Sequence, residues 1–309
     1  MLTVLATWAC SDPSARYLTR IHDEAVLDLR RGDLTGAQTL AERGLDLTRR
    51  HPADVWAWAF RLLRDESLIL QLKTTDTLAD LSAELPRDAA FDSLRARQKY
   101  LQARAKIAQG RFKEALDAAD NGRRTPSSQD VRFDLDVLSG QIRFRLGQRQ
   151  DAEALLRSVI SEAASIGDHY HQAWALNDLG MGGLVSNRFD EALSRFEPVL
   201  SLTDLEPFTI YSVSLYNAGI CYAQLGEYER AAALQRRAVE IHERRGPQSR
   251  LGQALGALGR TYALQGDFEQ ALPFLRRAFD VASAVHADSD AALLAGNVAE
   301  AHIELRQWD

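Results

Sequence analysis

The densest group of residues that could bind a metal ion is formed by Asp168, His169 and His171. Imidazole and carboxylate groups are common metal ligands. On a helix, however, residues two apart point to different sides, so His169 and His171 would not converge on one ion. We therefore interpret this group as a polar turn followed by a helix start, and we expect neither a metal site nor a cofactor.

Three further segments resemble parts of catalytic or nucleotide-binding motifs but lack a required residue. Residues 180–183 are rich in glycine, but the next glycine of a dinucleotide-binding loop is missing and the pattern around them is helical. Residues 242–246 begin like a metalloprotease helix without its second histidine. Cys221 has no histidine near it in sequence, which favours a buried thiol over a nucleophile. The sequence predicts no catalytic residue within the chain.

The composition excludes several classes of protein. The 309 residues are 46% hydrophobic and 26% charged, which is typical of a globular chain with a large core. A net charge of -6 disfavours a nucleic-acid partner, because binding to phosphates requires a basic surface. The two cysteines are too few for a disulfide framework or a cysteine-based zinc site. We find no apolar stretch long enough for a transmembrane segment.

A repeated motif organises the chain and would position any binding residues. The segments around 110, 187, 226 and 266 each contain a turn residue, an aromatic residue and an alanine three positions after the aromatic. Weaker copies begin at 32, 147 and 306, and the double spacing between 32 and 110 predicts a degenerate copy near 71. Apolar residues recur at helical spacing on both sides of each turn, and strand-like alternation is absent.

Each copy therefore predicts two antiparallel helices joined by a short turn. Closely packed helices need small residues where they cross, because a large side chain would push the backbones apart. No single pair can bury its own apolar face, so the pairs must stack. We expect the crossing positions to be Gly180, Gly219 and Gly259 in the first helices and Ala192, Ala231 and Ala271 in the second helices.

The units resemble tetratricopeptide repeats (TPR), in a longer variant of about 40 residues that is similar to the repeats of kinesin light chain and of bacterial CHAT-associated proteins. The resemblance covers roughly residues 17–309 and implies an all-α, right-handed superhelical solenoid of helix pairs. It also implies a scaffold that binds a peptide or a partner domain in a concave groove. The alternative is the regulatory N-terminal part of a larger bacterial enzyme, such as a CHAT-type caspase-like peptidase, with the effector domain downstream.

In repeats of this kind the first helix of each pair lines the concave side. Asn217 and Asn297 share one position of the repeat, and an amide side chain offers both donors and an acceptor to a peptide backbone. The alternative is that these asparagines cap or bridge neighbouring first helices. By alignment, the groove residues in this half of the chain are Asn177, Tyr216, Asn217, Gln224, Arg260 and Asn297.

A basic segment lies nearer the N-terminus. Residues 93–113 contain seven basic residues and no acidic residue. Arg97 and Arg104 are seven positions apart, so they share a helix face, and the register places them on the concave side. They could bind an acidic peptide or a terminal carboxylate through charge-assisted hydrogen bonds. The alternative is a solvated face whose charge is balanced by Asp117 and Asp120.

We divide the chain into an apolar segment (1–16), degenerate repeats (17–130), regular repeats (131–291) and the first helix of a truncated repeat (292–309). The apolar segment before Cys10 resembles the remnant of a lipoprotein signal, so we expect either a lipid anchor at Cys10 or a mis-assigned start. The corresponding locations are the bacterial envelope and the cytoplasm. An apolar helix without a partner is an unusual end for a solenoid, so we expect the polypeptide to continue.

Overall fold

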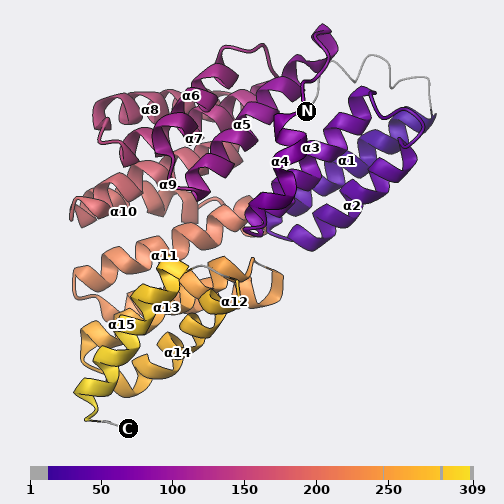
Figure 1. Ribbon diagram of the computed structural model, residues 1–309. Coiled ribbons are helices and arrows are strands. Elements are labelled where there is room, and N and C mark those ends of the chain that lie inside the picture. Colours follow the sequence, from indigo (N-terminus) through magenta and orange to yellow (C-terminus); the bar gives the residue numbers. More distant parts are fainter. Residues whose placement is uncertain (1–12, 246, 286–287, 307–309) are drawn as a thin grey trace. The chain divides into compact units, whose positions relative to one another are not determined.

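The computed structural model describes residues 13–245, 247–285 and 288–306 (Figure 1). Within these ranges the regular elements are all helices, and no strand occurs. Successive long helices pack against each other as pairs joined by short turns. The predicted all-α fold of stacked helix pairs is therefore confirmed. The predicted lipoprotein segment with Cys10 lies outside the described residues.

Contacts divide the chain into two compact units, Met1–Ala175 (unit 1) and Leu176–Asp309 (unit 2). The division falls inside helix α9, which differs from the boundary at 130/131 that the sequence predicts between degenerate and regular repeats. That boundary stays a prediction. The helices of unit 1 are α1 (Pro13–Arg31), α2 (Leu34–Leu47), α3 (Val55–Leu70), α4 (Leu78–Ser82), α5 (Asp92–Ala108), α6 (Phe112–Arg123), α7 (Gln129–Arg145) and α8 (Arg149–Ser165), with short 3-10 turns at Thr74–Thr77 and Ala89–Phe91.

Helix α9 (His169–Val185) begins in unit 1 and ends in unit 2. In both units the helices bury an alanine-rich face together with a few large side chains, such as Phe60 and Phe196, which have no exposed surface. The other helices of unit 2 are α10 (Phe189–Leu200), α11 (Thr209–Gln224), α12 (Tyr228–Arg245), α13 (Gln248–Gln265), α14 (Phe268–Ala284) and α15 (Asp288–Glu304), with a 3-10 turn at Thr203–Leu205.

The first helix of every pair ends in the same backbone conformation. One residue adopts a left-handed φ, which lets the next N–H reach back to a carbonyl inside the helix. After α11, for example, the N–H of Glu227 donates to the carbonyl oxygen of Tyr222 at 2.9 Å. The predicted turn positions all show this conformation, and the degenerate copy near 71 has it at a leucine. The residues, with φ between 54° and 85°, are Gly32, Leu72, Gly110, Gly147, Asn187, Gly226, Gly266 and Arg306.

The helices of a pair approach most closely seven residues before that turn residue. A Cβ atom added at Gly180 would lie only 2.5 Å from the ring of Phe196 in α10. At Gly259 it would lie 2.7 Å from Leu275 Cγ, and at Gly219 it would lie 3.0 Å from the carbonyl oxygen of Ala231. The second-helix alanines Ala192, Ala231 and Ala271 have no exposed surface. These positions therefore accept only small residues without a shift of the neighbouring helix.

Helix α3 shows what happens where the second helix is missing. Trp56, Trp58 and Phe60 lie in α3, as the degenerate copy predicts, but a five-residue helix, α4, replaces the expected long partner. Asp65 occupies the position where other first helices have glycine or alanine, and it is fully buried beside Arg64. Burial and the nearby Asp80 raise the pKa of Asp65 to about 7 despite that arginine.

Glutamine side chains from α5 take over part of the role of the missing helix. Gln98 Nε2 donates to the carbonyl oxygens of Asp80 and Ala83 at 2.8 and 2.9 Å. Gln102 Nε2 donates to the carbonyl oxygen of Leu81 at 2.5 Å. These bonds satisfy backbone groups at the end of α4 that a longer helix would have satisfied itself.

We predict opposite effects of the same substitution at two helix glycines. Gly180→Ala inserts a methyl group into the contact with Phe196 and should lower the free energy of unfolding by about 1–3 kcal/mol. Gly296→Ala in α15 is the matched control, because no atom lies within 4 Å of the added Cβ. It should be neutral or stabilise by up to about 1 kcal/mol through helix propensity. Urea unfolding followed by circular dichroism measures both, and equal effects would contradict the close approach.

Candidate partner-binding site

Two of the asparagines predicted to face a groove in unit 2 are instead buried and hydrogen-bonded to each other. Asn177 in α9 and Asn217 in α11 are both buried, and Asn217 Nδ2 donates to Asn177 Oδ1 at 3.0 Å. The two amides therefore bridge neighbouring first helices, which was the alternative interpretation of the sequence. In this conformation a peptide backbone would have to compete with that bond.

A second polar contact continues along the first helices of unit 2. The Tyr216 hydroxyl on α11 donates to Gln253 Oε1 on α13 at 3.1 Å, and Arg250 Nη1 donates to the same oxygen at 2.9 Å. Gln253 Nε2 in turn lies 3.4 Å from Asp290 Oδ2 on α15. These side chains connect α11, α13 and α15, so Tyr216 also stabilises the stack of first helices.

The other predicted residues of unit 2 lie closer to solvent. Gln224 at the end of α11 and Arg260 on α13 are exposed, whereas Asn297 on α15 is half-buried. The Asn297 Nδ2 atom is buried and has no hydrogen-bond partner among the described residues. Of the six predicted residues, Gln224 and Arg260 are therefore the ones that are exposed to solvent.

Large apolar side chains are also exposed on the first helices of unit 2, and the sequence analysis did not single these out. Val185 on α9 is 76% exposed, Leu264 on α13 48% and Ile303 on α15 52%. Each lies two or three residues before the left-handed turn residue of its own pair, as does Gln224. We call these four residues the exposed row. The shared position of Val185, Gln224 and Leu264 was visible in the sequence. The exposure of these side chains was not, because it depends on how the helices stack.

In unit 1 the predicted anion-binding residue Arg97 already has two anionic partners. Its guanidinium pairs with Glu66 on α3 and with Asp134 on α7. Arg97 and Asp134 both lie 13 residues before their turn glycines, Gly110 and Gly147, so the repeat places them side by side. The sequence analysis also considered that Asp120 balances the charge of the basic segment 93–113. Asp120 instead pairs with Arg123 and Arg143, which lie outside that segment.

The pairs around Arg97 continue to α9 through a buried histidine. His171 Nε2 lies 3.3 Å from Asp134 Oδ1, and Nδ1 lies 2.6 Å from Asp168 Oδ2. We call the residues Glu66, Arg97, Asp134, His171 and Asp168 the ion-pair chain. It connects the first helices α3, α5, α7 and α9 within unit 1.

The charge state of His171 follows from these neighbours. Burial alone would lower the pKa of His171, but the hydrogen bonds to Asp134 and Asp168 outweigh it and raise the pKa to about 9. Burial likewise would raise the pKa of Asp134, yet Arg97 and His171 hold it well below its ordinary value. One oxygen each of Asp130 and Asp168 and a ring nitrogen of His171 lie within 4.8 Å of one another. Both ring nitrogens of His171 already lie against carboxylates, those of Asp134 and Asp168, so we interpret this group as part of the ion-pair chain.

The second predicted arginine of unit 1 has a different environment. Arg104 is half-buried and donates to the Tyr100 hydroxyl at 2.9 Å, with its guanidinium 5.6 Å from the centre of that ring. No ion pair joins it to a carboxylate among the described residues within 4.0 Å. Of the predicted pair, Arg97 therefore contacts two carboxylates directly, whereas Arg104 contacts the Tyr100 hydroxyl.

Comparisons with known proteins agree with this architecture. Residues 209–284 and 96–121 match family models described as tetratricopeptide repeat. These two segments of the chain therefore carry tetratricopeptide repeats. The first segment lies in unit 2 and covers α11 to α14, and the second lies in unit 1 and covers parts of α5 and α6.

Solved structures show the same fold at low sequence identity. A Rap protein complexed with competence and sporulation factor is 16% identical, with a TM-score of 0.69 and coverage of 95% of this chain and 87% of that one. NprR in complex with its cognate peptide NprX is 15% identical, with a TM-score of 0.62 and coverage of 93% and 84%. Cut9 of the APC/C heterotetramer Cut9–Hcn1 is 16% identical, with a TM-score of 0.60 and coverage of 97% and 52%. No curated protein matches the chain significantly in sequence.

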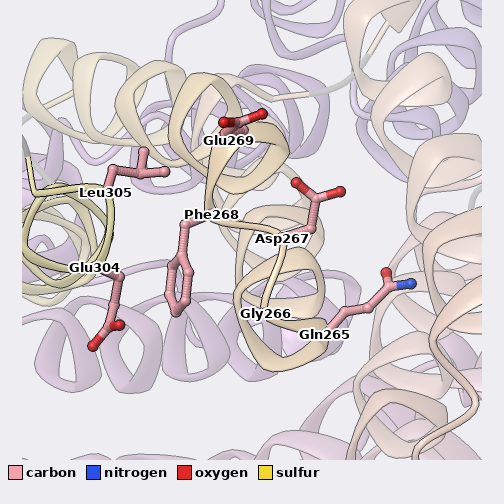
Figure 2. A pocket seen from close by; sticks show the side chains of 7 residues that line it. All are labelled: Gln265, Gly266, Asp267, Phe268, Glu269, Glu304 and Leu305. Carbon is pink, nitrogen blue, oxygen red and sulfur yellow. The ribbon is translucent and has the colours of Figure 1, made fainter.

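Two remaining features of the described residues offer no chemistry of their own. Cys221 has no exposed surface, and burial raises the pKa of its thiol to about 12, which disfavours a nucleophilic thiolate. An open hollow lies between the α13–α14 turn and the end of α15 (Figure 2). Its polar side chains, among them Gln265, Asp267 and Glu304, point in different directions and do not converge on one ligand position.

No helix among the described residues is long and apolar enough to cross a bilayer.

The ion-pair chain predicts a loss of stability in alkaline solution. Because the folded-state pKa of His171 is about 9 and its ordinary value is 6.5, the protonated ring stabilises the fold fully below pH 6.5. That contribution, on the order of 2–4 kcal/mol, should disappear as the pH rises through about 9. Melting temperatures between pH 6.5 and 10 measure it, and His171→Gln should flatten the decline.

His51→Gln is the control, because this histidine is exposed in the same unit. It should keep the steep alkaline decline of the original protein. A His171→Gln protein whose melting temperature falls as steeply as that of the control would show that His171 does not carry the proton.

Proposed function

We propose that this chain is a protein-interaction scaffold that binds a peptide or a segment of a partner protein along the exposed row of unit 2. The observation that carries the proposal is the exposure of Val185, Leu264 and Ile303, which lie two or three residues before the turn residues of α9, α13 and α15. Single exposed apolar residues are common on protein surfaces, but large exposed apolar side chains that recur near the same place in several repeats favour an interaction site.

Two exposed polar residues supply hydrogen bonds that an extended ligand needs. Gln224, within the row, offers both donors and an acceptor, and Arg260, one helical turn before Leu264 on α13, offers a charged donor group. The buried amides of Asn177 and Asn217 contribute in a different way, because their mutual bond holds α9 and α11 at a fixed spacing. A site built on rigid helices loses little entropy when a ligand binds.

Fold relatives support the class of partner. The Rap structure holds competence and sporulation factor and the NprR structure holds its cognate peptide NprX, on folds similar to that of this chain. This support is an analogy between folds, so the local chemistry of the exposed row has to carry the assignment. The alternative read from the sequence, a regulatory part of a larger CHAT-type enzyme, stays a prediction.

A displayed peptide library selected on the immobilised chain tests the proposal. We expect enriched peptides with apolar residues, and Val185→Ser with Leu264→Ser should weaken their binding about tenfold or more, because apolar burial is lost. Ile166→Ser is the matched control, because Ile166 in unit 1 is 53% exposed. Fluorescence anisotropy of a selected peptide measures all three proteins. Failure to enrich any peptide, or equal losses in the row and control variants, would contradict the proposal.

A further inference from the structure

Helix α12 has a polar residue at a position that other second helices fill with a large apolar side chain. Nine residues after the turn residue, α8 has Leu156, α10 has Phe196 and α14 has Leu275, and each has no exposed surface and faces the glycine of its first helix. Helix α12 has Gln235 at this position, also without exposed surface. A Cβ atom added at Gly219 would lie 2.7 Å from Gln235 Cγ, so an amide side chain fills this helix crossing.

One end of the Gln235 amide has no partner. Thr261 Oγ1 on α13 donates to Gln235 Oε1 at 2.7 Å, whereas Nε2 is buried and has no hydrogen-bond partner among the described residues. Rotating the amide by 180° exchanges its two ends at Thr261, so one end still lacks a partner among those residues. A buried donor without an acceptor destabilises the folded state, because it has given up its hydrogen bonds to water.

A second unpaired polar group lies about two helical turns further along the same face of α12. His242 is 2% exposed, and neither of its ring nitrogens has a hydrogen-bond partner among the described residues. At this position, sixteen residues after the turn residue, α8 has Ala163 and α14 has Ala282, which are both buried. A neutral imidazole always carries one N–H, so α12 buries another unpaired donor where the other helices have a methyl group.

The charged groups around His242 do not favour a protonated ring. Helices α11 and α13 pack against α12. Helix α11 contains no Asp, Glu, Lys or Arg, and the charged residues of α13 are Arg250 and Arg260. The other titratable side chains on these two helices are Tyr211, Tyr216, Cys221, Tyr222 and Tyr262.

The acidic residues of α12 nearest to His242 in sequence lie in solvent. Glu240 and Glu243 are both exposed, and Glu243 pairs with Arg277 on α14 at 2.6 Å. Burial, together with the positive charge of Arg250, lowers the pKa of His242 to about 4. The ring is therefore neutral in the closed structure, and it gains a proton more readily in water.

We propose that α12 is the helix of unit 2 that separates first from its neighbours, and that acid promotes this separation by protonating His242. In the separated state, water supplies the hydrogen bonds that Gln235 Nε2 and the His242 ring lack in the closed state. The corresponding positions of α14 are apolar, so exposing them brings no such gain. The inference goes beyond the proposed function, because it needs no ligand and does not involve the exposed row.

Hydrogen exchange of the whole chain, followed by mass spectrometry of its peptic peptides, measures the opening of each helix. At pH 7.5 the protection factors, which correct for the intrinsic exchange rate, should be lower in α12 than in α14. The neutral His242 ring contributes its full stability above pH 6.5, its ordinary pKa, and this contribution is lost as the pH falls towards about 4. Between pH 7.5 and pH 5 the protection of α12 should therefore fall about tenfold or more relative to that of α14.

Gln235→Leu tests the unpaired amide. It should raise the protection of α12 about tenfold at pH 7.5, because leucine fills the same position in α8 and α14 and has no donor to leave unpaired. Gln265→Leu is the matched control, because Gln265 is exposed at the end of α13, and it should leave α12 unchanged. An unchanged α12 in Gln235→Leu would overturn the role of the amide.

His242→Gln tests the proton. It should abolish the fall in α12 protection between pH 7.5 and pH 5, whereas His51→Gln, at an exposed histidine of unit 1, should keep it. Circular dichroism checks that each variant is folded, and Gln235→Leu decides the case if His242→Gln is not. Equal protection of α12 and α14 in the original chain at both pH values, or an acid-dependent fall that persists in His242→Gln, would overturn the proposal.

Discussion

The structure depends on the close approach of two helices at one position in each repeat. At Gly180, Gly219 and Gly259 the second helix comes so near that a single added carbon atom would overlap it. This contact, together with the left-handed residue seven positions later, fixes the angle and offset of each helix pair. Because the geometry recurs with the repeat, residues at equal distances from the turn are placed side by side on successive first helices.

That regular placement gives polar residues two different roles. Some of them meet a partner on the next first helix and become structural: Arg97 with Asp134 at the same position of the repeat, and Asn177 with Asn217 at positions that differ by one residue. Others, such as Gln224 and Arg260, find no such partner and remain exposed. Buried polar pairs specify the register of the stack, because a slipped register would leave a charge or an amide unsatisfied. The exposed residues are then held at defined positions for a ligand.

The sequence predicted the repeats well because their signals are local. A glycine or asparagine that can adopt a left-handed φ and a small residue at a helix crossing are visible without a structure. The ion-pair chain was missed, although the equal distance of Arg97 and Asp134 from their turn glycines indicated it. The short helix α4 could not be predicted, because it depends on tertiary bonds from Gln98 and Gln102. The exposed row could not be predicted either, because the exposure of a side chain depends on how the helices pack.

Hydrogen exchange of the whole chain with and without a library-selected peptide tests the central claim most directly. The account predicts slower amide exchange on peptide binding at the ends of α9, α11 and α13, where Val185, Gln224 and Leu264 lie. The backbones of the second helices α10, α12 and α14 should exchange at unchanged rates. Protection confined to those second helices, or no change in any helix of unit 2 with the peptide bound, would contradict it.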